Sequence, residues 1–227
     1  MANQKWRRIF IAATAVTVMT MGAQSFAAGA DFTDLEGNAA KAHIVELQQK
    51  GILHGVGGGA FMPDAPLTAA QAVELLVNGL DLNLDTVRFV KEPLATDYFS
   101  QADNGGWYAQ ALITAAVNGV DLPRDLNPGE EWTREEFTHR LILAIEQHSN
   151  LPVIKLAPVD IADGGEITSG YDGSIQRALA LGIAGLDTGG QFHPGDSITR
   201  GEAAEMLYHA LEYVAAHPAP AGEAGGQ

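Results

Sequence analysis

One unit recurs three times along the sequence. Thr68, Thr133 and Thr199 lie 65 and 66 residues apart, and a proline stands five residues before each of them. Two residues before each proline is a large apolar residue; these positions hold Phe61, Leu126 and Phe192. Repetition of this kind divides the chain into three similar units.

Each unit predicts two helices joined by a loop. Ala40, Ile44 and Leu47 recur near helical spacing, and Gly51 then takes the place of a left-handed residue that ends a helix. The same glycine, followed by a β-branched residue, recurs in the other copies at Gly119 and Gly182. The loops that follow are rich in Gly, Pro and Asp, which do not continue a helix.

The second helix of each unit is predicted to start at the threonine. A Gln or Glu three positions later completes a capping box; the pairs are Thr68 with Gln71, Thr133 with Glu136 and Thr199 with Glu202. Apolar residues then follow every four positions and predict one buried stripe per helix. The residue before the threonine is also apolar, and at this position Trp132 suits either the core or a groove wall.

The first 27 residues are interpreted as a secretory signal peptide. Lys5, Arg7 and Arg8 precede an uncharged, mostly apolar run, and Ser25 and Ala27 suit the small-residue positions of a cleavage site. The alternative is a membrane anchor, but a spanning helix needs about 20 apolar residues. We therefore expect export, with no membrane insertion after cleavage.

Charge and cysteine content exclude several classes of function. The net charge is -15, and removal of three basic residues with the signal peptide leaves 10 basic against 28 acidic residues, or -18. This charge argues against a nucleic-acid partner, because phosphate binding needs a basic surface. With no cysteine, disulfides and cysteine-type zinc sites are absent, and the core alone must stabilise the chain.

The repeated unit resembles the S-layer homology (SLH) family. The matching motifs are Phe32 with Asp34, the tryptophan at Trp107, "GI" at Gly51 and Gly182, "FMPD" at 61–64, "FHPG" at 192–195, and the helix starts "TREE" and "TRGE". We delimit repeats at 31–80, 97–146 and 160–214, with linkers at 81–96 and 147–159 and a disordered tail at 217–227. Three departures from the pattern are Ala39 for tryptophan, Gln101 for aspartate and an enlarged "DGGEITSGYDG" in the third copy.

The resemblance implies an all-α fold in which three helix-loop-helix repeats close into a pseudo-threefold assembly. It also implies a non-catalytic, secreted protein held noncovalently to the cell wall of a Gram-positive-type bacterium. The implied partner is an anionic secondary cell-wall glycan, notably one that carries a pyruvate ketal, bound in grooves between repeats. The alternative function is an extracellular protein-interaction scaffold or S-layer accessory subunit, which would bind another exported protein.

Arg134 and Arg200 are the candidate glycan-binding residues, beside the capping Thr133 and Thr199. An arginine at a helix start, near unpaired amides and the positive end of the helix dipole, suits a carboxylate, which a guanidinium binds through two hydrogen bonds. Ala69 takes this position in the first copy and predicts a weak or silent groove, unless Lys41 or Lys50 replaces the missing charge. The alternative is that both arginines are ordinary surface residues paired with Glu135 or a nearby Asp.

Trp107, Gly182 and Gly185 are secondary candidates for glycan contact. The indole could stack on a sugar face, although an aromatic residue at this place often serves packing. The glycines could let backbone amides approach a ligand, although turn geometry is the commoner reason for them.

No enzyme, cofactor or metal signature stands out. The seven histidines are scattered without a repeated ligand spacing, and "DIADGGE" at 160–166 does not fit the EF-hand pattern. Carboxylate pairs such as Glu135 with Glu136 are expected to be solvated surface in so acidic a chain. We predict no catalytic residues, no cofactor and no metal site.

Overall fold

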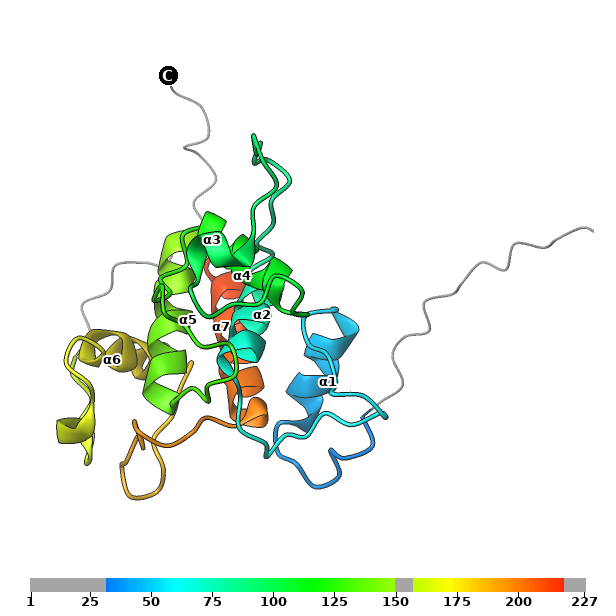
Figure 1. The fold of residues 1–227 in the computed structure, drawn as a ribbon. Helices are drawn as coiled ribbons and strands as arrows, with labels where there is room; N and C mark the ends of the chain where they lie inside the picture. Colours follow the sequence, from blue (N-terminus) through cyan, green and yellow to red (C-terminus); the bar gives the residue numbers. More distant parts are fainter. Residues whose placement is uncertain (1–31, 150–156, 219–227) are drawn as a thin grey trace, which may run out of the picture.

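The computed structural model describes residues 32–149 and 157–218, and within these ranges the chain is helical (Figure 1). The proposed signal peptide and nearly all of the proposed tail lie outside the described residues. The elements are, in chain order, α1 Lys41–Gln49, α2 Ala69–Gly79, α3 Ala95–Tyr98, α4 Ala109–Val117, α5 Arg134–His148, the 3-10 turn η1 Gly164–Glu166, α6 Asp172–Ala180 and α7 Arg200–Ala216. None of these helices is long and apolar enough to cross a membrane.

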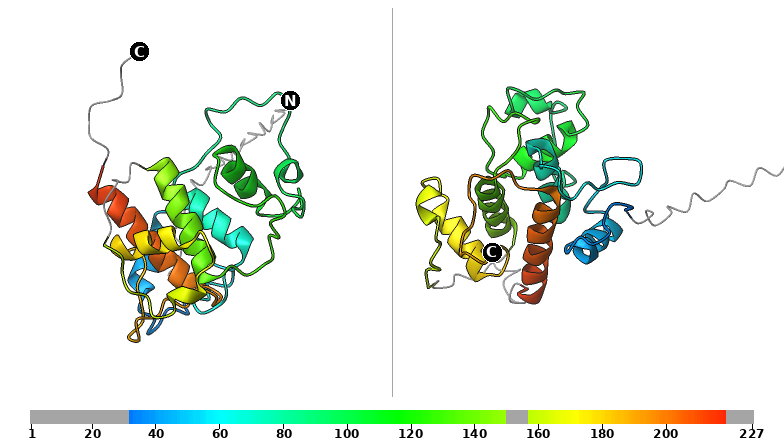
Figure 2. Two further views of the ribbon diagram at one scale, coloured as in Figure 1. Left: turned by 90° about the vertical axis from the view of Figure 1, so that its left-hand side faces the viewer. Right: turned by 90° about the horizontal axis from the view of Figure 1, so that it is seen from below.

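Three helix-loop-helix units make up the described part of the chain, and each supplies one inner and one outer helix. Unit 1 contributes α1 and α2, unit 2 contributes α4 and α5, and unit 3 contributes α6 and α7. The inner helices α2, α5 and α7 pack on one another at the centre (Figure 2). Each outer helix packs on the inner helix of a different unit: α4 on α2, α6 on α5, and α1 on α7. The α1 and α7 contact closes the chain into a cycle, as the predicted pseudo-threefold fold requires.

A closed ring of backbone hydrogen bonds joins the three units just before their inner helices begin. The amide of Leu67 donates to the carbonyl of Ile198 (2.9 Å), that of Ile198 to Trp132 (3.0 Å), and that of Trp132 to Leu67 (3.1 Å). All three side chains are buried, and that of Trp132 is fully enclosed. Trp132 is therefore a core residue rather than a groove wall.

The helix ends follow the predicted signals in most places. Gly51, Gly119 and Gly182 have positive φ angles of 72°, 76° and 70° and end the outer helices. Thr68 and Thr199 form complete capping boxes. The predicted box at Thr133 is only half formed, because the Glu136 side chain binds Arg140 instead of the cap amide.

An aspartate at the start of units 1 and 3 fixes the loop before the inner helix. The Asp34 carboxylate accepts hydrogen bonds from the amides of Phe61 and Met62, and Asp163 accepts from Phe192 and His193. These bonds lower the pKa of Asp34. At Asp163, burial raises the pKa but the two amides outweigh it and the net direction is downward.

Acid unfolding tests this role of the two carboxylates. Because their pKa values are lower in the folded protein, the stability they contribute is present above about pH 4 and is lost as the pH falls through the folded pKa. We expect the free energy of unfolding to fall less between pH 5 and pH 3 in Asp34→Asn/Asp163→Asn than in the parent, measured by urea titration. The control Asp64→Asn/Asp85→Asn removes two exposed carboxylates; equal slopes in the two double variants would refute the assignment.

Candidate functional site

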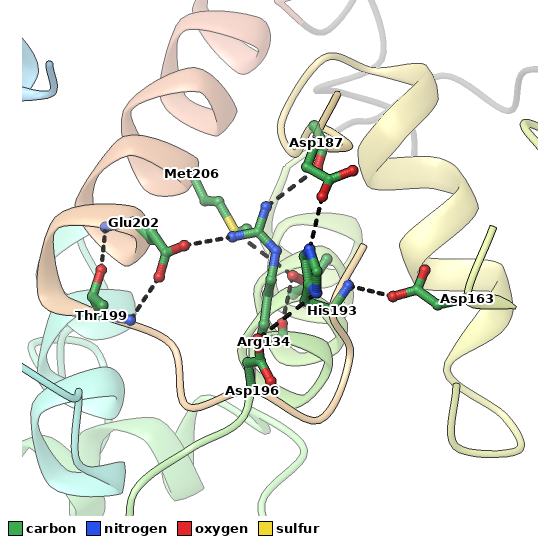
Figure 3. Close-up of polar contacts among 10 residues, drawn as sticks. Arg134, Asp163, Asp187, His193, Asp196, Thr199, Glu202 and Met206 are labelled. Carbon is green, nitrogen blue, oxygen red and sulfur yellow. Dashed lines mark hydrogen bonds and ion pairs between the residues drawn. The ribbon is translucent and has the colours of Figure 1, made fainter. Parts of the chain in front are cut away.

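A cavity of about 690 Å³ lies between units 2 and 3, and we call it the Arg134 groove. One wall is the loop of unit 3, including residues 182–187 and 191–193, and the other is the first part of α7. Arg134, the first residue of α5, reaches into it from unit 2 (Figure 3). The site is therefore formed between two units and not within a single one.

The Arg134 guanidinium is held on two sides. Its Nη1 donates to the Glu202 carboxylate (3.1 Å) and its Nη2 to the carbonyl of Gly185 (3.2 Å), while the group lies 5.1 Å from the centre of the Phe192 ring. Its Nε is shielded from solvent and has no hydrogen-bond partner. Burial lowers the pKa of Arg134, and the negative charges of Glu202 and of nearby Asp196 and Glu205 oppose that shift. The arginine thus keeps an unsatisfied donor.

Glu202 connects the groove to the helix cap. One carboxylate oxygen accepts the hydrogen bond from the Thr199 amide (2.9 Å), and the other accepts from Arg134. The alternative partner foreseen for this arginine, Glu135, is instead buried and binds the amide and hydroxyl of Thr168 at 2.8 and 2.6 Å. Glu135 and Glu136 were expected to be solvated, and both are engaged in specific contacts.

His193 adds an imidazole beside two carboxylates to the same cavity. Its Nε2 lies 3.0 Å from the Asp187 carboxylate and its Nδ1 lies 3.8 Å from Asp196. The hydrogen bond with Asp187 raises the pKa of His193. Sequence reasoning missed this residue, although its place immediately before Pro194 in the repeated loop was the available signal.

Arg200 takes the equivalent position between units 3 and 1 but is more deeply enclosed. Its Nε donates to the carbonyl of Phe61 (2.8 Å) and its Nη2 to that of His54 (3.0 Å), and it lies 4.5 Å from the Phe61 ring centre. Phe61 and His54 correspond to Phe192 and Gly185 of the Arg134 groove. Arg200 is only 7% exposed, and the cavity beside it measures about 30 Å³. These hydrogen bonds of Arg200 join units 3 and 1.

At the third position Ala69 replaces the arginine and its charge, and the loop of unit 2 instead binds an arginine of its own unit. Arg140 of α5 donates to the carbonyl of Asp121, pairs with Glu136 at 2.9 Å and lies 5.2 Å from the centre of the Trp132 ring. Neither lysine considered for this role reaches it, since Lys41 pairs with Glu36 and Lys50 with Glu46. Three arginines therefore lie over buried aromatic rings, Arg134 and Arg200 across an interface between units and Arg140 within unit 2.

The amides at the starts of the inner helices are hydrogen-bonded, whereas from the sequence we expected them to be unpaired and open to a carboxylate. The first two amides of each helix donate to loop carbonyls of another unit, and Thr133 and Thr199 accept the third amide through their side chains. The pairs are Ala69 to Glu130, Ala70 to Pro128, Arg134 to Asp196, Glu135 to Pro194, Arg200 to Ala65 and Gly201 to Pro63. Free backbone donors for a carboxylate are therefore absent at these positions, and the repeated prolines provide acceptors between units.

Of the secondary candidates for glycan contact, the two glycines lie at the Arg134 groove and Trp107 lies away from it. Gly182 and Gly185 line the Arg134 groove, where Gly182 ends α6 with positive φ and Gly185 offers its carbonyl to Arg134. Trp107 precedes α4 and is 62% exposed, with its ring against Tyr108. It does not line either arginine cavity.

Two of the three units match a known protein family. The family model of the S-layer homology domain covers residues 31–73 and 160–204, which contain the motifs of units 1 and 3. Two segments of the chain match the S-layer homology domain. This domain is a cell-wall anchoring module, and the match indicates a protein of the cell surface of a Gram-positive-type bacterium, associated with its wall. Unit 2 lies outside the matched segments, and its assignment as a third copy stays a prediction.

Curated relatives resemble the chain over most of its length. Exoglucanase XynX of Acetivibrio thermocellus is 27% identical over 80% of this chain, Amylopullulanase of Thermoanaerobacterium thermosulfurigenes is 26% identical over 80%, and the Surface-layer 125 kDa protein of Lysinibacillus sphaericus is 25% identical over 96%. The matched regions make up 16%, 9% and 18% of those proteins. The similarity therefore concerns a small part of each relative.

Proposed function

We propose that this protein is a non-catalytic wall anchor that binds an anionic secondary cell-wall glycan in the Arg134 groove. The observation that carries the proposal is an incompletely satisfied guanidinium in the wall of a cavity of about 690 Å³. This volume is within the usual range for small-molecule sites. The resemblance to the SLH family supplies the ligand class, a glycan with a pyruvate ketal.

The charge of the groove favours a localised anion over a polyanion. Four carboxylates, those of Asp187, Asp196, Glu202 and Glu205, share the cavity with the guanidinium of Arg134 and the imidazole of His193. A neutral sugar with one carboxylate would place that group on Arg134, while its hydroxyls donate to the surrounding carboxylates. A densely charged polymer would be repelled.

Arg134 can bind such a ligand while it keeps its hydrogen bonds to Glu202 and Gly185. A guanidinium has five N–H donors, and Glu202 and Gly185 occupy one each. An unsatisfied buried donor costs about 1–3 kcal/mol, so a small rotation that gives Nε a carboxylate partner is favourable. The planar group then binds the carboxylate through two parallel hydrogen bonds.

A protein-binding scaffold is the second candidate, and a separate surface favours it. Val87, Phe89, Val90 and Leu94 are exposed on the segment between α2 and α3, which extends away from the helices (Figure 1). Exposed apolar side chains gathered in one segment are typical of interaction sites. This function does not require Arg134.

Cosedimentation with Gram-positive wall sacculi tests the proposal. We expect the protein to sediment with intact sacculi and to stay in solution when the secondary glycan has been stripped from them. Arg134→Gln should weaken binding by about 10- to 100-fold, as expected for loss of hydrogen bonds to a charged group. The control Arg88→Gln makes the same change of charge on an exposed residue. Equal sedimentation of Arg134→Gln and Arg88→Gln would refute the assignment of the groove.

A further inference from the structure

Two histidines and a glutamate from opposite ends of the described chain meet where the fold closes. His43 lies on α1, and Glu205 and His209 lie one turn apart on α7. Figure 2 shows these helices side by side, in agreement with their direct packing. One potential ligand atom from each residue lies within 4.8 Å of the other two. The cluster therefore depends on closure of units 1 and 3.

The distances within the cluster do not fit an ordinary hydrogen-bonded pair. Nδ1 of His43 and Nε2 of His209 each lie 3.9 Å from the same oxygen of Glu205, beyond hydrogen-bond range. Nδ1 of His43 is moreover shielded from solvent and has no hydrogen-bond partner. A buried nitrogen without a partner costs free energy, which a bound ligand would recover.

We propose that His43, Glu205 and His209 bind a divalent transition-metal ion of the zinc class. Two imidazole nitrogens and one carboxylate oxygen are a ligand set that Zn²⁺ uses, with a further position open to water. Ligand atoms around tetrahedral zinc lie about 3.3 Å apart, so these side chains must close by roughly 1 Å. Rotation of partly exposed side chains allows this movement.

Neighbouring groups hold the cluster in position. The Tyr208 ring stacks on His43 with the ring centres 4.0 Å apart, and the rings of His43 and His209 meet edge to face at 5.2 Å. Glu205 and His209 share one face of α7 because residues four apart in a helix are neighbours. A bound ion would cross-link α1 to α7 and stabilise the closed fold, since it would bind only the folded arrangement.

The site also borders the Arg134 groove, because Glu205 and His209 belong to its lining. A cation there would neutralise Glu205, one of the carboxylates whose charge acts on Arg134. Arg134 would then attract a ligand carboxylate more strongly. This consequence rests on the proposed glycan binding, whereas the metal site itself does not.

Titration of the full chain, without a histidine tag and without glycan, tests the site. We expect calorimetry with Zn²⁺ to give one saturable site, and Co²⁺ to give a visible absorption spectrum that Zn²⁺ abolishes. His43→Gln and His209→Gln should each weaken Zn²⁺ binding by at least about tenfold. Zn²⁺ should raise the unfolding midpoint of the parent protein and leave that of both variants almost unchanged.

The matched control is His193→Gln, which removes another histidine that lies beside carboxylates. It should bind Zn²⁺ like the parent. Absence of saturable binding, or equal affinity in His43→Gln, His209→Gln and the control, would overturn the proposal. Glu205→Gln supplies a further ligand variant if one histidine variant does not fold, as judged by circular dichroism. Failure of glycan binding with Zn²⁺ binding intact would refute only the proposed function.

Discussion

Replacement of Trp132 by alanine is expected to lower the free energy of unfolding by about 3–5 kcal/mol, the range for loss of a large buried aromatic side chain. Trp132 is fully buried at the point where the three units meet, and its backbone takes part in the ring of hydrogen bonds. Urea unfolding measures the change.

Trp107→Ala is the control for this prediction. Trp107 is 62% exposed, so the same substitution should change the free energy of unfolding by less than about 0.5 kcal/mol. Comparable losses of unfolding free energy in the two variants would show that burial of Trp132 where the three units meet contributes no special stability. The same control variant reveals whether Trp107 contacts glycan, since its folding should be intact.

Arg200→Ala is expected to destabilise the protein by about 3 kcal/mol. The substitution leaves the carbonyls of Phe61 and His54 without their charged donor, and removes a side chain that is 7% exposed and lies over the Phe61 ring. Because these bonds join units 3 and 1, closure of the cycle should weaken. Thermal and urea unfolding measure the effect.

Arg200→Lys separates the two parts of this contact. Lysine keeps the charge but lacks the planar fork that reaches two carbonyls, so its stability should be intermediate. Arg88→Ala, on an exposed residue, should be nearly neutral. Loss of wall binding by Arg200→Ala at unchanged stability would contradict the structural role. It would indicate that Arg200 binds glycan. For this reason a variant that changes both Arg134 and Arg200 is unsuitable for testing binding.

The repeated residues predicted the fold because they act locally. The threonines begin the inner helices, the glycines end the outer ones, and the all-α, pseudo-threefold arrangement is confirmed. The partners of those helix ends were not predictable in the same way. The loop carbonyls that satisfy the first amides come from other units, and although the repeated prolines supply half of them, the local pattern does not show which unit each carbonyl reaches.

The surroundings of the candidate site residues were not predictable for the same reason, because other units provide them. The motif located Arg134 and Arg200 but could not distinguish a residue on an open cavity from one enclosed against Phe61, because neighbouring loops decide this. The contacts of Arg140 were likewise not predictable, because its position in the inner helix holds Leu75 and Met206 in the other units. His43 and His209 are 166 residues apart, and their approach depends entirely on closure of the cycle.

Binding of a ketal carboxylate by Arg134 is tested by changing the protein and the ligand together. Glycan fragments with and without the pyruvate ketal are titrated into the parent protein and into Arg134→Gln, with Arg88→Gln as the control. If Arg134 binds the ketal carboxylate, either change alone weakens binding by about 10- to 100-fold and both together cost little more than one. Losses that simply add, so that the ketal effect persists in full in Arg134→Gln, would show that Arg134 does not bind the ketal carboxylate.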